Sequence, residues 1–392
     1  MILKIPKWYF CMVQELTSKV GIIGGGPAGC FCAYHLQDEF DVTVFEYKKP
    51  LGTLLVTGGG RCNFAHYEFD NKELAANYPR GEKFLYSVFS RFATGETLEF
   101  FENLGVPYYV QDDMRIFPKS NSAADIRDRF LKSLYKTRFK KERVLRINQN
   151  PLTVVTDMGS YSFDKIVIAA GGHNGYDCAK FLGHNIISPK PALTGLKTHE
   201  NFKSLSGVSV KNVKTMNFVG DILFTHEGIS GPLIYKISSV KARDSFPYKL
   251  SFNLVGNVNL QEELDNNPHK SIKNILSEFV PKSLSEYVLR RLNIQEDRKS
   301  HTIDGKTRDT ILNSLQRFEV TVIAPSKGAE VVTAGGIDLK EINPKTMESK
   351  LVENVYFCGE VLDIDGFCGG FNLQNCWSTG YCAAIGIKSK LT

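Results

Sequence analysis

The sequence has no apolar run long enough for a membrane-spanning helix. No stretch of about 18 consecutive apolar residues occurs among the 392 residues, so no transmembrane segment is expected. Met1 to Ser18 contain neither a long apolar region nor a small-residue cleavage site, and so are unlike a signal peptide. Met12 is a candidate alternative start. We therefore expect a cytoplasmic protein with no membrane partner.

The cysteines form none of the common structural patterns. Nine are present, but no two make a Cys-x-x-Cys pair, and their spacings match neither a zinc site nor a disulfide framework. We expect a reducing compartment and no metal site.

Charge and length set only broad limits. The net charge of +6 is compatible with an anionic cofactor, with an anionic partner, or with solubility alone. Hydrophobic residues make up 42% and charged residues 23% of the chain, as in ordinary globular proteins. A chain of 392 residues is expected to form roughly two or three domains.

The most informative stretch is a glycine turn between two apolar runs. Val20–Ile23 leads into Gly24-x-Gly26-x-x-Gly29, and a helix-compatible stretch follows before the second run, 41–45, which ends in Glu46. This order of strand, glycine turn, helix, strand and acid is the dinucleotide-binding fingerprint. Gly26, Pro27 and Ala28 are expected beside a pyrophosphate at the helix N-terminus. Glu46 is expected to bind ribose hydroxyls, which argues against a 2′-phosphate.

A second glycine-rich stretch follows a β-like run, Leu54–Val56. It contains Gly58, Gly59 and Gly60 and continues as Arg61-Cys62-Asn63. The glycines would allow the backbone to lie flat against a ligand, with a cation and an amide beside it. A flexible, solvated loop is the alternative, and we favour ligand contact.

Two more apolar runs close on small or acidic residues. The run 165–168 ends in Ala169-Ala170-Gly171-Gly172, as expected for a buried parallel strand that approaches a cofactor. The run 355–357 leads to a glycine, acids and a final helix. In many flavoproteins, the N-terminus of such a helix lies at the edge of the flavin ring that becomes negatively charged on reduction. The alternative is a plain βα unit. With Val144, the predicted cofactor contacts of these regions are Ala170, Gly171, Gly359, Glu360, Asp363, Gly370, Phe371, Asn372 and Leu373.

The middle of the chain has a different character. Alternating strands precede apolar stripes that predict helices over 271–279 and 284–292, with Ile311, Leu315 and Phe318 as a third stripe and with 261–269 as a linker. Earlier in the chain, 83–104 is expected to be one helix. We predict an α/β protein with a first segment over 1–193, an inserted domain over 194–331 and a returning segment over 332–392.

Together these motifs resemble the flavoprotein family called aminoacetone-oxidase-like or BaiN/RdsA-like. The resemblance runs in family order from about Lys19 to Gly386. The motifs that carry it, besides those above, are Arg115–Ser120, Phe224–Pro232, Thr333–Ile337, Glu341–Asn343, Thr346–Lys350, Gly359–Gly366 and Gly369–Gln374.

The resemblance implies a Rossmann-like FAD-binding domain in two segments and an insert that combines a β-barrel with helices. It implies FAD as cofactor and NAD(P)H-linked reduction of C=C bonds, with substrates from small steroid-like enones to a uridine in ribosomal RNA. The chain departs from the family at Thr53, where lysine is usual, and in a shortened segment after Gly171-Gly172.

The candidates for chemistry in the pocket are Arg61, Arg115, His226 and Ser230. Arg61 could balance the reduced flavin or the pyrophosphate, and His226 has a side chain suited to proton transfer near neutrality. The alternative for His226 is a structural role beside a turn, with Ser230 as the N-cap of a helix and Pro232 in its first turn. For Cys62 and Cys368, packing is favoured over redox chemistry.

We expect a reductase of a conjugated C=C bond. The nicotinamide would visit the flavin transiently, because a second Gly-x-Gly-x-x-Gly is absent. The alternatives are an oxidase that uses O₂ and an RNA-binding protein with a structural or sensing FAD. If the substrate is RNA, we expect basic segments such as 136–143 and Arg290-Arg291 to contact phosphates. The sequence does not predict the oligomeric state.

Overall fold

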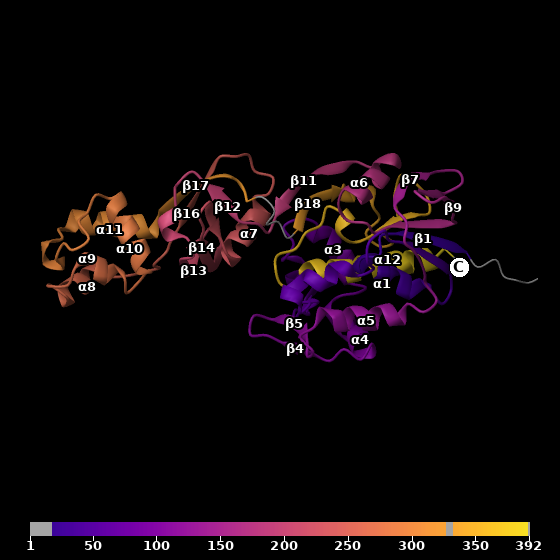
Figure 1. Cartoon of the computed structure of the whole chain (residues 1–392), viewed down its shortest axis with the longest axis horizontal. Helices are drawn as coiled ribbons and strands as arrows, with labels where there is room; N and C mark the ends of the chain where they lie inside the picture. The colour runs from indigo at the N-terminus through magenta and orange to yellow at the C-terminus, as the bar shows by residue number, and fades with distance from the viewer. Residues whose placement is uncertain (1–17, 327–331, 391–392) are drawn as a thin grey trace, which may run out of the picture. The chain divides into compact units, whose positions relative to one another are not determined.

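The computed structural model describes residues 18–326 and 332–390 (Figure 1). The chain divides into two units. One comprises Met1–Pro189 and Thr333–Thr392, and the other comprises Lys190–Val332. Met12 and Cys11 lie outside the described residues, as does the expected end of the insert at Val331.

The first unit is built on a five-stranded parallel sheet with the order β19-β10-β1-β2-β6. The strand bounds are β1 Lys19–Ile23, β2 Asp41–Phe45, β6 Arg138–Lys140, β10 Lys165–Ile168 and β19 Val355–Phe357. The three inner strands contain near-continuous runs of buried apolar residues, as strands covered on both faces require. The two ends of the chain therefore contribute neighbouring strands to one sheet, because β19 pairs with β10.

Helices from both ends of the chain pack closely in this unit. Helix α1 (Pro27–Leu36) lies against α12 (Phe371–Lys388), seen as indigo beside yellow in Figure 1. Gly380 of α12 allows this approach, because a Cβ there would lie 2.7 Å from the Ala28 carbonyl oxygen and 3.3 Å from the Phe31 Cβ. A larger residue would push the helices apart.

The remaining elements of the first unit surround this sheet. Two three-stranded sheets have the orders β3-β5-β4 and β7-β8-β9, and β11 pairs with β18. The strand bounds are β3 Ala65–His66, β4 Tyr108–Val110, β5 Arg115–Pro118, β7 Val144–Asn148, β8 Thr153–Thr156, β9 Ser160–Ser162, β11 Ile186–Ala192 and β18 Val332–Ile337. The helix bounds are α2 Asn71–Ala75, α3 Glu82–Phe89, α4 Thr94–Asn103, α5 Ala123–Ser133 and α6 Gly172–Phe181.

Two local predictions for this unit are wrong. The stretch 83–104 is two helices, α3 and α4, because Ala93 has an extended backbone and its N–H donates to the Glu96 carboxylate at 2.8 Å, which starts a new helix. Leu54–Val56 is not a strand. It lies in the 3₁₀ segment Gly52–Gly60, where Leu54 is buried and Val56 is exposed.

The second unit contains a closed antiparallel barrel. Its strand order is β13-β14-β15-β12-β17-β16. The bounds are β12 Leu196–Thr198, β13 Ser209–Thr215, β14 Phe218–Phe224, β15 Gly228–Ser230, β16 Tyr248–Phe252 and β17 Phe318–Pro325. Lys214 of β13 and Asn253, just after β16, exchange backbone hydrogen bonds of 3.0 and 2.8 Å, which joins the first and last strands. The expected barrel is thus confirmed.

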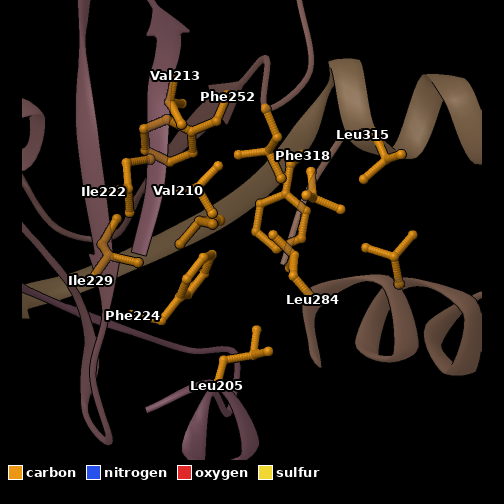
Figure 2. Close-up of a cluster of buried hydrophobic side chains, with 14 of the residues drawn as sticks. Leu205, Val210, Val213, Ile222, Phe224, Ile229, Phe252, Leu284, Leu315 and Phe318 are labelled. Carbon is orange, nitrogen blue, oxygen red and sulfur yellow. The ribbon is translucent and has the colours of Figure 1, made fainter. Parts of the chain in front are cut away.

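The helices of this unit share the apolar core of the barrel. They are α7 Pro232–Val240, α8 Leu260–Asn266, α9 Ile272–Leu276, α10 Lys282–Arg291 and α11 Gly305–Gln316. Figure 2 shows Phe318 between barrel residues such as Val210 and the helical residues Leu284 and Leu315, all of them buried. The barrel and the helices therefore bury one continuous cluster.

Two predictions for the insert are also corrected. The linker expected over 261–269 contains α8, which Asn259 caps at the Glu262 N–H and which buries Leu260 and Leu264 one turn apart. Phe318 belongs to β17 rather than to a helix, although it is buried in the same cluster. Within 18–326 and 332–390, no helix is long and apolar enough to cross a membrane.

Candidate functional site

The glycine turn after β1 shows a different role for each glycine. Gly24 has φ +103°, and a Cβ there would lie 2.7 Å from the Ala170 nitrogen. A Cβ on Gly29 would lie 2.0 Å from the Gly24 carbonyl oxygen, so both glycines allow close packing. A Cβ on Gly26 would meet no protein atom within 4 Å. The space at Gly26, beside the N-terminus of α1, is therefore open to a phosphate group.

Glu46 is held rigidly at the end of β2. Its Oε2 accepts the Gly25 N–H at 3.0 Å, and its Oε1 accepts the Lys48 N–H at 2.7 Å. Each carboxylate oxygen has a second lone pair that can still accept a ligand hydroxyl. The carboxylate is thus held in one orientation beside the glycine turn, and its binding of a ribose stays a prediction.

A cavity of about 440 Å³ connects these features with the start of α12. It brings together Gly24, Gly26, Pro27, Ala28, Glu46, Val144, Ala170, Gly171, Glu360 and Leu373 of the predicted cofactor contacts. Predicted contacts that do not line it are Gly29, Gly59, Gly60, Arg61, Cys62, Asn63, Gly359, Asp363, Gly370, Phe371 and Asn372. Their contact with a cofactor stays a prediction.

Several lining residues were missed by the sequence reasoning. They include Tyr47, Lys48, Thr57, Glu142, Asn174, Thr333 and Cys376. Asn174 belongs to α6, which begins at Gly172 in the segment that is shorter than in the family. Thr53, where the family usually has lysine, also lines the cavity. Their positions depend on how separate loops fold together, which no local motif encodes.

An acid lines the cavity, and a buried phenol outside the lining is close enough for the charge of this acid to affect it. Glu360 faces the cavity, and desolvation by the surrounding walls, followed by the charge of Asp365, raises its pKa. Tyr176 of α6 is buried, and burial, then Glu360 and Asp363, raises the pKa of its phenol to about 12. The Tyr176 hydroxyl has no hydrogen-bond partner among the described residues. A buried polar atom of this kind favours an additional polar group beside it.

The loop before α12 is fixed from several sides. Arg80 and the buried Asp365 form a two-pronged ion pair. The Tyr78 hydroxyl donates to the Phe371 carbonyl at 2.6 Å. Asn63, with its amide oriented by its neighbours, accepts the Gly370 N–H at 2.9 Å. The N-terminus of α12 is thus held in place, as a site for a developing negative charge requires.

The predicted catalytic residues Arg61 and Arg115 meet at one aromatic ring. The Arg61 guanidinium lies 4.2 Å from the Phe117 ring centroid, and that of Arg115 lies 5.9 Å from it. Arg115 also pairs with Asp113 at 2.6 Å. Arg61 has no ion pair within the described residues, and its Nε donates to the Gly58 carbonyl at 3.3 Å. Of the two arginines at the Phe117 ring, Arg115 is therefore paired with a carboxylate. Arg61 is not paired with one among the described residues, so its positive charge can interact with an anionic ligand.

His66 belongs to the same region and was missed. It lies on the two-residue strand β3, directly opposite Arg115 in the pairing with β5. Its Nδ1 is 3.0 Å from the Gly369 carbonyl oxygen, just before α12. A strand of two residues has no detectable periodicity. In the sequence, the one feature that could have pointed to His66 is its closeness to the Arg61-Cys62-Asn63 motif.

His226 and Ser230 belong to the second unit. His226 is exposed in the turn between β14 and β15. Gly231, with φ +102°, is the N-cap of α7, so the expected N-cap role of Ser230 is wrong; Pro232 occupies the first turn as expected. The Ser230 hydroxyl instead lies 3.4 Å from that of Tyr235. A catalytic role of His226 stays a prediction.

The thiols near the cavity differ in exposure. Cys62 is fully buried, and burial raises its pKa to about 12, which suits packing rather than thiolate chemistry. Cys368, in the loop before α12, is exposed. No group of three or more metal-binding side chains occurs within 18–326 and 332–390.

Comparison with known proteins identifies the family. The model for the HI0933-like protein Rossmann domain matches residues 18–386. The chain belongs to the HI0933-like family. It is therefore a flavin-dependent oxidoreductase, and the predicted Rossmann-type FAD-binding fold is confirmed.

Three curated relatives match over nearly their whole length. A ribosomal RNA dihydrouridine synthase of Escherichia coli is 30% identical over 93% of this chain and 96% of the relative. One of Haemophilus influenzae is 28% identical over 94% and 98%. A 3-dehydro-bile acid delta(4,6)-reductase of Clostridium scindens is 27% identical over 93% and 98%.

The fold is also similar to that of solved flavoenzymes. A flavocytochrome c3 fumarate reductase in its open conformation has a TM-score of 0.51, with 13% identity over 97% of this chain and 79% of that one. At this identity the likeness concerns the fold alone.

The residues of the cavity fit FAD. Glu46 would hold the ribose, Gly26 and the N-terminus of α1 would hold the pyrophosphate, and the first turn of α12 would face the flavin.

Proposed function

We propose that this protein reduces a conjugated C=C bond in a uracil ring of ribosomal RNA, with NAD(P)H as the source of electrons and FAD as their carrier. The observation that carries the proposal is the group of aromatic and cationic side chains around β3 and β5, beside the start of α12. The names of the relatives support the reaction type but leave the substrate class open, because an RNA enzyme and a bile-acid reductase are similarly related to the chain.

The side chains around β3 and β5 suit an unpaired base. Tyr67 and Phe69 are exposed and form an edge-to-face pair with ring centroids 4.7 Å apart. Met114, exposed beside them, accepts the Tyr67 N–H at its carbonyl. Bases in single-stranded RNA stack on aromatic rings and on arginine planes. The exposed aromatics that follow β3, together with the two arginines at the Phe117 ring of β5, therefore favour a flat, anionic substrate over a fully apolar one.

The structure changes which basic residues are expected to bind phosphate. Lys136 pairs with Asp38, Arg138 with Asp41 and Lys140 with Glu142. Arg290 pairs with both Glu286 and Glu296. These carboxylates already compensate the cations, so neutralising Lys140 or Arg290 should weaken RNA binding little. Arg61, which has no such carboxylate among the described residues, is the better candidate.

The proposed donor is a nicotinamide that binds only transiently. The sequence contains a single Gly-x-Gly-x-x-Gly, at Gly24, Gly26 and Gly29, and we assign this site to FAD. NAD(P)H would reduce the flavin and leave before the substrate binds. Reduction of the substrate then needs one hydride from the reduced flavin and one proton from an acid.

The test uses the holoprotein without oxygen. The flavin is reduced with NADH or NADPH, and its reoxidation is followed after adding unmodified ribosomal RNA fragments, a small steroid-like enone, or O₂. We expect RNA to reoxidise the flavin and to gain two hydrogens at a uracil by mass spectrometry. We also expect its binding to weaken steeply as salt rises. Arg61→Gln should reduce the salt slope by about one unit, with Lys140→Gln as the matched control.

Other outcomes would replace the proposal. Reoxidation by the enone alone, independent of salt, would identify a small-molecule reductase. Rapid reoxidation by O₂ with peroxide release, and none by either acceptor, would identify an oxidase. Tight binding of RNA that is never reduced would identify an RNA-binding protein whose flavin has another role.

A further inference from the structure

His66 is held in one orientation by three neighbours. It pairs with Arg115 across β3 and β5. Its ring lies on Phe371, the first residue of α12, with centroids 4.5 Å apart and an angle of 32° between the planes. Its Nδ1 is 3.0 Å from the Gly369 carbonyl oxygen. Because a carbonyl oxygen only accepts, Nδ1 carries the proton of the neutral ring.

The other ring nitrogen, Nε2, is left available. No described residue hydrogen-bonds to it, and the side chain is only half-buried. In the neutral ring Nε2 is an acceptor, and in the imidazolium it becomes a second donor. A proton can therefore enter and leave at Nε2 while the bond from Nδ1 to Gly369 keeps the ring in place.

His66 is next to both parts of the proposed site, through its ring contact with Phe371 and through its position in the chain. On one side is the start of α12, whose first two turns line the cofactor cavity through Leu373 and Cys376. On the other side, the next residues along the chain lead to the exposed pair Tyr67 and Phe69. A substrate on these rings that reaches toward the cavity would pass His66.

We propose that His66 is the acid of the reaction, giving the proton at Nε2 to the substrate carbon that does not receive the hydride. This proposal rests on the proposed function. The hydride from the reduced flavin bonds to one carbon of the C=C bond, and the electron pair of that double bond takes the proton at the other carbon. Nε2 is left unprotonated and regains a proton from water. One hydride and one proton are consumed, and the flavin is the only group oxidised.

The charges around His66 give this acid a recognisable pH dependence. Burial, as the largest effect, lowers the pKa of His66 below its ordinary value. The Gly369 carbonyl, Asp113 and Glu68 raise the pKa, and Arg115 lowers it. On the α12 side, the Phe371 ring that contacts His66 is uncharged. The exposed titratable group in the loop before α12 is the thiol of Cys368, which adjoins Gly369 in the chain. The substrate-reduction step should therefore slow as the pH rises through this pKa.

His66→Asn is the sharpest variant. The asparagine amide nitrogen can take the place of Nδ1 toward the Gly369 carbonyl, whereas no atom replaces Nε2. We expect the anaerobic reoxidation of the flavin by substrate to slow by about 10²–10⁴-fold and to lose the pH-dependent limb. Reoxidation by ferricyanide, which needs no proton on carbon, should be unchanged. An unchanged rate and pH profile with substrate would overturn the proposal.

Two further measurements separate His66 from its neighbours as the source of the proton. Nitrogen NMR of histidine-labelled holoprotein should show the Nδ1–H tautomer for His66, and an Nε2–H tautomer would contradict the proposal without any turnover. Cys368→Ser should retain the pH-dependent limb; if it loses the limb while His66→Asn keeps it, Cys368 is the acid instead. If no acceptor of the substrate panel reoxidises the wild-type flavin, the proposed function fails. In the turnover assay, the proposal for His66 fails when wild type and His66→Asn behave alike.

Discussion

Asn372 binds the backbone of Gly366 with both ends of its amide. Its Oδ1 accepts the Gly366 N–H at 2.9 Å, and its Nδ2 donates to the Gly366 carbonyl at 2.9 Å. The side chain therefore closes the loop that leads into α12, in addition to any contact with the flavin. A substitution at this position tests the loop and the electrostatics of the site together.

Asn372→Asp should lower both the stability and the flavin midpoint potential. The carboxylate would place an oxygen against the Gly366 carbonyl, and losing this hydrogen bond costs about 1–3 kcal/mol. Its negative charge would disfavour the anionic reduced flavin. Denaturant unfolding and redox titration measure the two effects. Asn259→Asp, which adds the same charge at an exposed helix cap of the second unit, should leave the potential unchanged. An unshifted potential in folded Asn372→Asp would place the α12 N-terminus away from the flavin.

The ion pair of Arg80 and Asp365 should stabilise the same loop strongly. Arg80→Met would remove the guanidinium that pairs with a fully buried carboxylate, and breaking a buried ion pair in this way typically costs about 3–5 kcal/mol. The double variant Arg80→Met with Asp365→Leu also removes the buried carboxylate and should recover most of this loss. Urea unfolding of the two variants checks the prediction. A single variant as stable as wild type would show that the carboxylate is compensated by other groups.

Gly26→Val should remove FAD while leaving the fold intact. A Cβ at Gly26 meets no protein atom within 4 Å, so the apoprotein has room for the valine side chain. In the holoprotein this side chain would occupy the space of the bound pyrophosphate. FAD content after gel filtration, together with the thermal unfolding of the apoprotein, provides the measurement. Gly95→Val, at another glycine with open space around it, serves as the control. Wild-type FAD content in Gly26→Val would refute the assignment of this turn.

His35 should make the protein sensitive to mild acid. Its Nε2 is buried without a partner among the described residues, and burial, followed by the charge of Lys388, lowers its pKa from 6.5 to about 4. Between these values the unfolded chain binds the extra proton and the folded chain does not, so the free energy of unfolding falls as the pH drops. The loss attributable to His35 between pH 7 and pH 5 should be about 2 kcal/mol.

His35→Phe tests this expectation, because it keeps an aromatic ring beside Phe31 and Tyr381 but cannot titrate. Denaturant unfolding at pH 7 and pH 5 should show a smaller decrease for His35→Phe than for wild type. Equal decreases in the two proteins would assign the acid sensitivity to other groups, among them His184, whose pKa burial also lowers.

The sequence predicted the parts of the site whose spacing is itself the signal. Gly24, Gly26 and Gly29 lie at a fixed spacing within one short turn after β1, and Glu46 directly follows the apolar run of β2, so both signals are readable from the local sequence. His66 was not readable, because its position depends on pairing with Arg115 and on a loop about 300 residues later. Helix α8 was missed because its seven residues bury only Leu260 and Leu264.

The pairing of β19 with β10 and of α12 with α1 has a consequence for synthesis on the ribosome. The first unit needs its last strand and helix to cover the sheet edge at β10 and the apolar face of α1. Chains generally begin to fold from the N-terminus as they emerge. The second unit precedes β19 and α12 in the chain and can therefore fold before they are synthesised. Until then, the first segment of the first unit keeps apolar surface exposed. Truncation within α12 should therefore yield chains that chaperones retain or proteases degrade, even though the glycine turn and Glu46 are intact.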